Sequence, residues 1–112
     1  MGGSDTSSVE RAAINPDCSL GPWQIISQMN TIRHTFASVR VGNFIYAIGG
    51  QNGTDASLRT VEKAQINSDG SLTTWEFVSS MIDRRCDFAA VFAQGYIYAI
   101  GGSSCQSSPY NS

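Results

Sequence analysis

The sequence has few charges and no long apolar run, and each shortage excludes a class of protein. Charged residues make up only 14% of the 112 residues, and the formal net charge is -2. No basic patch is therefore available to bind a polyanion, and nucleic acid is not an expected partner. Apolar runs are only a few residues long, and the first residues have neither a basic start nor an apolar core. The sequence predicts neither a membrane span nor a signal peptide.

Signatures of catalysis and of metal binding are also missing. The chain has no G-x-S-x-G, H-E-x-x-H or P-loop pattern, and His34 is its single histidine. Three cysteines, Cys18, Cys86 and Cys105, make an odd number without CxxC spacing, which favours a reducing, cytoplasmic location. We therefore expect no catalysis, no cofactor and no metal.

A repeat dominates what is present. The stretch "FIYAIGG" at 44–50 returns as "YIYAIGG" at 96–102, and "VERAAINPDCSLGPW" from Val9 aligns at the same offset with "VEKAQINSDGSLTTW" from Val61. About 21 of the 52 aligned positions are identical, too many for chance at one fixed offset. The sequence thus predicts a leader at 1–8 and two repeats, at 9–60 and 61–112.

Each repeat is predicted to form four short strands. Residues 35–41 alternate between two faces, and "GN" turns them into "FIYAI" at 44–48, which is typical of a β-hairpin. After a polar loop, "VEKAQI" at 61–66 indicates a third strand and "WEFVS" at 75–79 a fourth. No segment favours a helix. The expected fold class is all-β, with antiparallel units of about 50 residues.

This pattern resembles the kelch-repeat β-propeller family over nearly the whole chain. Paired glycines, tyrosines, tryptophans and an M-x-x-x-R spacing carry the resemblance. They are Gly49, Gly50, Gly101, Gly102, Tyr46, Tyr98, Trp23, Trp75, Met29, Arg33, Met81 and Arg85. One departure is alanine in the third strand, at Ala12 and Ala64, where the family often has an aromatic residue. The resemblance implies propeller blades of four antiparallel strands.

The residues of the motif suit structural roles. Glycine pairs permit backbone angles and close approach that a side chain forbids. Tyrosine and tryptophan offer flat surfaces for packing one blade on the next. We expect Arg33 and Arg85 to hold the loops by donating to backbone carbonyls.

Two blades cannot close a propeller, because each blade packs on two neighbours. The sequence starts with the third and fourth strands of one blade and finishes with the first and second strands of another. Pairing these halves head to tail between copies closes a ring with four, six or eight blades. We predict a homotrimer with six blades. The alternatives are a fragment of a larger kelch protein, and an enzyme whose site forms only at subunit junctions.

The resemblance places ligand or peptide binding on the loop face near the central channel. The candidate contacts there are Arg84, Asp83, His34, Asn52 and Asp55. Arg84 is the strongest candidate, because Arg85 takes the structural position and leaves Arg84 to bind a carboxylate. The alternative is a solvated loop with an internal ion pair.

Two further polar positions remain open from sequence alone. Arg40 is a charge in a strand expected to line the channel, where it either meets water or an anionic ligand, or pairs with an acidic loop residue. His34 and Cys86 occupy matching positions in the two repeats. They would alternate around a ring and could bind a metal, although tolerance of both in a loop is the simpler interpretation.

Overall fold

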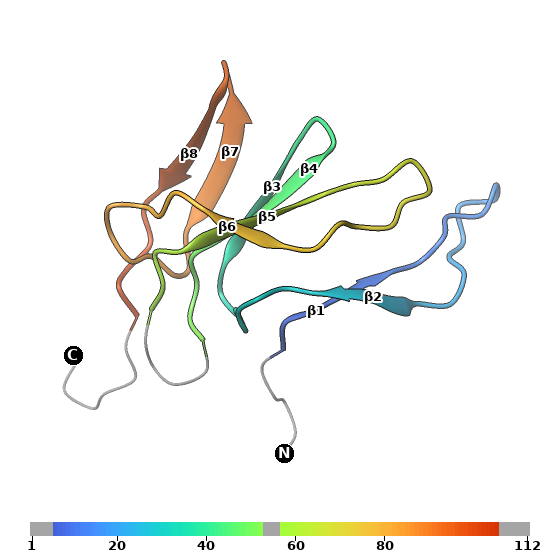
Figure 1. Ribbon diagram of the computed structural model, residues 1–112, viewed down its shortest axis with the longest axis horizontal. Coiled ribbons are helices and arrows are strands. Elements are labelled where there is room, and N and C mark those ends of the chain that lie inside the picture. Colours follow the sequence, from blue (N-terminus) through green and yellow to red (C-terminus); the bar gives the residue numbers. More distant parts are fainter. Residues whose placement is uncertain (1–5, 53–56, 106–112) are drawn as a thin grey trace.

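The computed structural model describes residues 6–52 and 57–105, which form strands and no helix (Figure 1). The strands, in chain order, are β1 (Ser8–Arg11), β2 (Gln24–Gln28), β3 (Ala37–Val41), β4 (Phe44–Ile48), β5 (Val61–Gln65), β6 (Glu76–Val78), β7 (Ala89–Ala93) and β8 (Tyr96–Ile100). The predicted all-β fold class is confirmed. Among the described residues no helix is long and apolar enough to cross a membrane.

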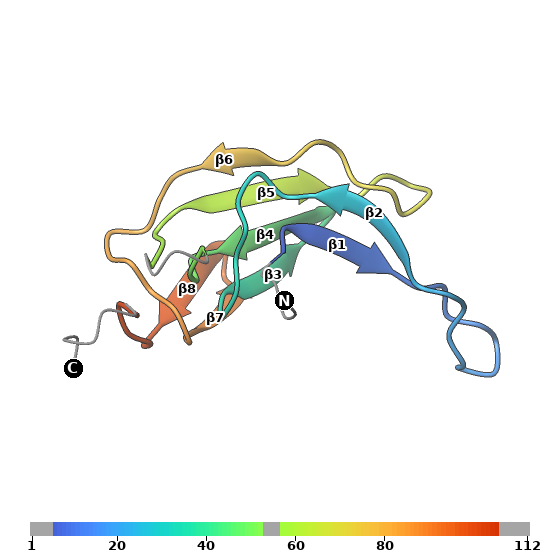
Figure 2. The same cartoon turned by 90° about the horizontal axis from the view of Figure 1, so that it is seen from below.

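The strands form three antiparallel sheets that follow one another along the chain. The middle sheet has four strands in the order β3-β4-β5-β6, and a two-stranded sheet lies on either side, β1-β2 and β7-β8. In Figure 1 the middle sheet has β7-β8 on one side and β1-β2 on the other, and Figure 2 shows the four strands of the middle sheet in order. Only the middle sheet is therefore a complete blade within the described residues.

The alternation of side chains along β3 explains which of them enter the core. Ala37 and Val39 in β3 are buried, whereas Ser38 and Arg40 are exposed. Because successive strand residues point to opposite faces, the apolar set covers one face and the polar set the other. This is the alternation that the sequence predicted.

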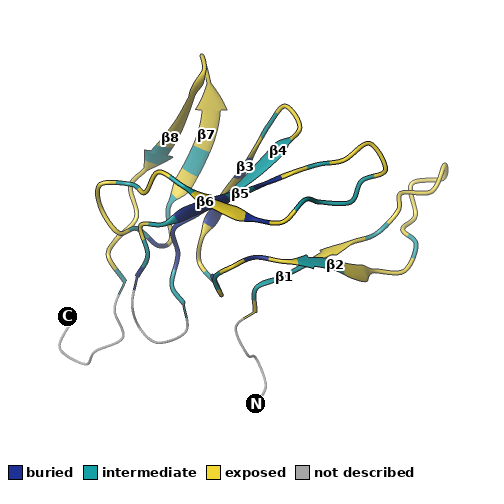
Figure 3. Cartoon of the chain, viewed as in Figure 1, coloured by how far each residue is buried: buried dark blue, intermediate teal, exposed yellow. Residues whose placement is uncertain are grey.

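Two apolar clusters join the middle sheet to its neighbours. On the β1-β2 side, buried Met29, Ala47, Ala64 and Trp75 pack together, with Val9, Ile45 and Leu72 against them. On the β7-β8 side, buried Val39, Ile48 and Val61 pack with partly buried side chains that include Met81, Phe88 and Ala90. Figure 3 shows the buried residues concentrated in and near the middle sheet, with exposed residues on the flanking strands. The middle blade thus carries the core.

Each repeat has a tight turn, between β1 and β2 in the first repeat and between β5 and β6 in the second. In the second repeat Gly70 adopts φ of 83°, and the Asp69 carboxylate accepts bonds from the Ser71 N–H and hydroxyl at 2.9 and 2.6 Å. In the first repeat Cys18 occupies the matching position with φ of 72°. A cysteine is strained there, because L residues other than glycine disfavour positive φ.

Candidate functional site

The loop between β6 and β7 lines a surface hollow of about 500 Å³. The loop is anchored to the first repeat, because the Gly50 N–H donates to the Arg85 carbonyl at 2.8 Å and the Arg85 N–H donates to the Leu58 carbonyl at 3.1 Å. The hollow is lined by Ile82, Asp83, Arg84, Arg85, Gly101, Gly102, Ser103 and Ser104. Asp83 and Arg84, two of the predicted contacts, thus share one concave surface with the second glycine pair.

The two arginines of this loop differ in their surroundings. Arg85 donates from Nη1 to the Gly101 carbonyl at 2.8 Å, and its Nη2 lies 4.0 Å from the Asp83 carboxylate. Arg84 is exposed, and in the part of the chain that the structure describes no group bonds to its guanidinium. An exposed ion pair at 4.0 Å contributes little. Arg84 is therefore the cation of this loop that is available to an outside carboxylate.

The equivalent position of the first repeat holds a buried ion pair. Arg33 Nη2 lies 3.1 Å from Glu62 Oε2, and both side chains are fully shielded from solvent. Arg33 also donates from Nη1 to the carbonyls of Gly49 and Thr60, at 3.0 and 2.9 Å. Burial lowers the pKa of the guanidinium, and the bond to Glu62 opposes that shift. The arginine nevertheless remains charged, since guanidinium groups do not lose their proton in proteins.

Glu62 completes this arrangement and was not predicted from the sequence. Its carboxylate accepts from the backbone N–H groups of Asn30 and Thr31, at 2.7 and 3.1 Å, as well as from Arg33. A signal was present in the sequence. A glutamate recurs at the second position of the third strand in both repeats, as Glu10 in "VERAAI" and as Glu62 in "VEKAQI".

The remaining polar candidates lie nearby or elsewhere. His34 exchanges two backbone bonds of 2.9 Å with Gln51, so His34 and Asn52 belong to neighbouring chain segments beside the first glycine pair. Asp55 lies outside the described residues. Arg40 is exposed on β3, where its Nε donates to the Gly42 carbonyl at 2.9 Å. No carboxylate among the described residues pairs with Arg40, so one of the two predicted interpretations, pairing with an acidic loop residue, receives no support.

The glycine pairs lie at positive φ, from 61° to 92°. A Cβ atom on Gly50 would come within 2.5 Å of the His34 carbonyl oxygen, and one on Gly49 within 2.7 Å of the Arg85 carbonyl oxygen. A Cβ atom on Gly102 would come within 2.5 Å of the Cys86 carbonyl oxygen, whereas one on Gly101 meets nothing within 4 Å. The first pair is thus enclosed by its neighbours, and the second is open on one side.

The aromatic residues of the motif show the same contrast. Trp75 exposes 5% of its surface and Trp23 exposes 60%. Tyr46 packs against the second cluster, while Tyr98 is exposed and contacts Tyr96 with a distance of 6.2 Å between ring centroids. Blade-to-blade packing of these rings is therefore complete for only one member of each pair.

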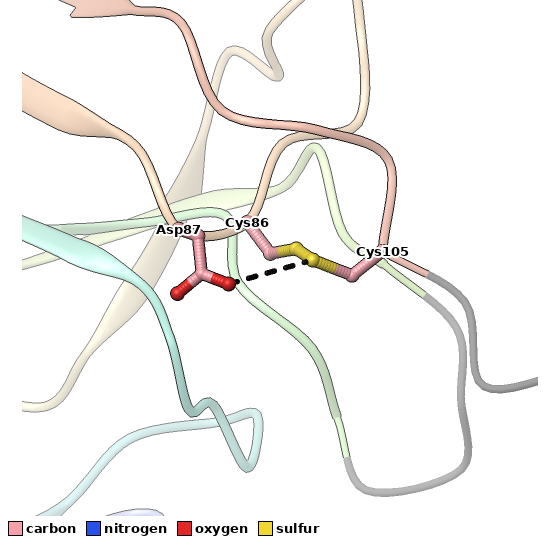
Figure 4. A group of neighbouring side chains, drawn as sticks. All are labelled: Cys86, Asp87 and Cys105. Atoms are coloured by element: carbon pink, nitrogen blue, oxygen red, sulfur yellow. Dashed lines mark hydrogen bonds between the residues drawn. A yellow bond between two sulfur atoms is a disulfide. The ribbon is translucent and has the colours of Figure 1, made fainter. Parts of the chain in front are cut away.

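Cys86 and Cys105 are joined by a disulfide beside the Asp87 carboxylate, as Figure 4 shows. Cys18 is free and exposed. The sequence does not predict this pairing, because spacing alone does not say which cysteines meet. One potential ligand atom each of Cys86, Asp87 and Cys105 lies within 4.8 Å of the others. The sulfurs of a disulfide are not thiolate ligands, and His34, the other half of the predicted metal pair, is not part of this group.

Comparison with known proteins agrees with the motif residues. The kelch motif matches residues 32–63, which run from the loop holding Arg33 through β3, β4 and the first half of β5. The chain thus contains a kelch motif, and the predicted kelch-repeat resemblance is confirmed. Its own Arg33, glycine pair and Glu62 all lie within the matched segment.

Several longer kelch proteins are similar to this chain. Human kelch-like protein 13 is 30% identical over 80 residues, which cover 71% of this chain and 12% of the relative. Mouse kelch-like protein 9 is 29% identical over 82 residues, covering 73% and 13%. An F-box/kelch-repeat protein of Arabidopsis thaliana is 28% identical over 88 residues, covering 79% and 22%. The matched part of this chain thus spans less than a quarter of the length of these relatives.

Proposed function

We propose that this protein is a non-catalytic binding or scaffold module, which takes a peptide or protein ligand at the loop face of a β-propeller. The observation that carries the proposal is the exposed Arg84 guanidinium at the rim of the 500 Å³ hollow. The kelch motif favours a protein partner. An unpaired guanidinium favours a carboxylate of that partner, because arginine binds carboxylates through two parallel hydrogen bonds.

His34, Asn52, Asp83 and Asp55 remain proposed contacts around the same face. The bonds from Gly50 to Arg85 and between His34 and Gln51 support a common face for the first two and for Asp83. Arg40 is proposed as a contact for an anion, on the ground of its exposure. The motif glycines, aromatics and arginines are proposed to have structural roles.

We further propose that copies associate head to tail to close the propeller, as a trimer with six blades. The strands β1 and β8 each belong to a two-stranded sheet, whereas the middle sheet has four strands. A second candidate is that these repeats form part of a larger kelch propeller. The greater length of the relatives favours it, and in that case a neighbouring repeat takes the place of the second copy.

A panel of short peptides tests the binding proposal. The isotopically labelled full chain is titrated with peptides that are acidic, neutral or basic, and backbone NMR shifts are followed. We expect acidic peptides to shift the resonances of residues 82–85 and 101–104, with binding weakened at least tenfold by Arg84→Ala. Arg59→Ala, another exposed arginine, serves as the matched control. Equal binding by the Arg84 variant would contradict the proposal.

A cytoplasmic location is also proposed, on the cysteine count. The Cys86–Cys105 disulfide weighs against it, because disulfides are rare in reducing compartments. Counting alkylated thiols by mass spectrometry, in protein taken rapidly from its native cells, decides between a reducing and an oxidising location. Three reactive thiols support a reducing location, and a single thiol at Cys18 contradicts it.

A further inference from the structure

A second surface hollow, of about 290 Å³, lies between the middle sheet and β8. Its apolar lining includes Val61, Met81, Ile97 and Ala99. Together with the loop hollow beside Arg85, it makes two concave sites on the β7-β8 side of the molecule. The internal repeat indicates what fits each hollow, because the equivalent place in the other repeat is filled by residues of the same chain.

The apolar hollow matches the first cluster with its tryptophan removed. In that cluster Trp75 packs among Met29, Ala47, Val9 and Ile45. An offset of 52 residues turns these four partners into Met81, Ala99, Val61 and Ile97, which all line the hollow.

The same offset turns the other three members of the cluster into residues of the first hairpin. They are Ala12, Leu20 and Trp23, the counterparts of Ala64, Leu72 and Trp75. Leu20 is 52% exposed and Trp23 is 60% exposed. In the first cluster the Trp75 Nε1–H donates to the Ser27 hydroxyl at 3.0 Å. The counterpart of that serine, Ser79, also lines the apolar hollow.

The loop hollow matches the site of Glu62 with its carboxylate removed. Glu62 is held by the N–H groups of Asn30 and Thr31 and by Arg33. The counterparts of these three donors are Ile82, Asp83 and Arg85, which all line the loop hollow. Within the described ranges neither the Ile82 nor the Asp83 N–H has a hydrogen-bond acceptor. The counterpart of Glu62 is Glu10, which is exposed on β1.

Strand register places both contacts on one edge. β4 pairs with β5 so that Ala47 lies opposite Glu62 and Ile45 opposite Ala64. The offset converts this into β8 paired with β1, with Ala99 opposite Glu10 and Ile97 opposite Ala12. In one molecule β1-β2 and β7-β8 flank the middle sheet on different sides (Figures 1 and 2), so the pairing requires two molecules.

We propose that the β1-β2 hairpin of a second copy docks on β8, with Trp23 filling the apolar hollow beside Met81 and Ala99 and Glu10 bound to Arg85 in the loop hollow, which leaves Arg84 at the rim for the ligand. This proposal rests on the proposed self-association and specifies its contact surface. Charge complementarity between Glu10 and Arg85 and the apolar match at Trp23 both favour a copy of this chain as the occupant. Since hairpin and receptor lie on different sides of the molecule, the contact is head to tail.

Two variants separate the hairpin from its receptor. Trp23→Ala removes the ring that fills the apolar hollow and leaves the receptor intact. Ala99→Arg blocks the hollow and leaves the hairpin intact. We expect each variant alone to have the mass of one 12.0 kDa chain by light scattering. Mixed in equal amounts, they should form a complex of two chains, because one functional hairpin then meets one functional receptor.

Matched controls come from exposed positions whose counterparts are also exposed. Ile25→Ala changes an apolar side chain on the same hairpin, and its counterpart Phe77 is exposed. Phe92→Arg adds a charge to the β7-β8 sheet that also carries Ala99, and the counterpart of Phe92 is already an exposed arginine, Arg40. Both controls should associate like the parent chain. Circular dichroism confirms that each variant is folded.

The outcomes distinguish this proposal from the binding proposal. Association unchanged by Trp23→Ala and Ala99→Arg, or a mixture that stays at one chain, would overturn the docking of the hairpin. Acidic peptides are then titrated into the Trp23→Ala chain. Retained binding that depends on Arg84 would leave the loop-face function standing without the junction. If the variants have the expected masses but no peptide binds, the loop-face function is overturned and the docking of the hairpin stands.

Discussion

Trp75 and Trp23 occupy the same position in two repeats, yet one is buried and the other is exposed. The arginines differ in the same direction, since Arg33 and Glu62 are both fully buried, whereas Arg85 is partly exposed and its carboxylate neighbour, Asp83, is exposed at 4.0 Å. Local sequence does not cause the difference, because the motif residues are identical. The neighbouring strands do: β4 is paired with β5, which carries Glu62, whereas β8 has no third strand beside it among the described residues. Trp75 likewise packs against Met29 and Val9 on the β1-β2 side, and Trp23 has no such cluster around it within the described ranges. A kelch motif therefore specifies a blade only together with the blade beside it.

The largest expected effect contrasts the two tryptophans. Trp75→Ala should lower the free energy of unfolding by about 3 to 5 kcal/mol, because it leaves a cavity in the cluster with Met29 and Ala64. Trp23→Ala should change it by less than about 0.5 kcal/mol in dilute protein, as expected for an exposed side chain. Urea unfolding at low protein concentration measures both. Equal losses for the two variants would contradict the comparison.

The buried carboxylate gives the next effect. Glu62→Gln should lower the free energy of unfolding by about 3 kcal/mol, since Arg33 then keeps a buried charge without a counter-ion. Glu10→Gln in dilute protein serves as the matched change at the same repeat position. Thermal unfolding followed by circular dichroism compares the two. A Glu62 variant as stable as the Glu10 variant would show that the ion pair does not hold the loop.

A smaller effect of opposite sign is expected at the turns. Cys18→Gly should raise the free energy of unfolding by about 1 kcal/mol, because it relieves the positive φ that Gly70 already accommodates in the second repeat. Cys18→Ser controls for loss of the thiol and should be neutral. No gain in the urea midpoint for the glycine variant would contradict the strain at this turn.

The smallest effect tests a feature that both repeats share. Bonds from Ser19 and Ser71 hold the pKa of the Asp17 and Asp69 carboxyls below 3.8, with Arg11 adding to the effect at Asp69. Because the folded pKa is depressed, this stabilisation is present above the unfolded value and is lost as the pH falls through the folded value. NMR titration should find both values below 3.8. A normal value at either aspartate would show that its turn is open.

Much of the fold was accessible from sequence because the repeat shows the alternation twice. The hairpin of β3 and β4 and the third strand follow from local patterns of apolar and turn residues. The sequence also indicated that the motif arginines donate to carbonyls, but it did not identify Glu62 as the ion partner of Arg33, because that contact joins residues 29 apart. The Cys86–Cys105 pairing was missed for a similar reason. Candidate ligand contacts such as Arg84 depend on a partner, so no pattern within one chain decides them.

The mass of the native chain in solution, measured by light scattering over a range of concentrations, tests the central claim most directly. If exposed Trp23 and partly exposed Arg85 bind a second copy, the mass should rise from that of one 12.0 kDa chain to a plateau near three times that value. A mass of one chain at every concentration would contradict the account, because the exposed edge of β8 would then have no hairpin to bind.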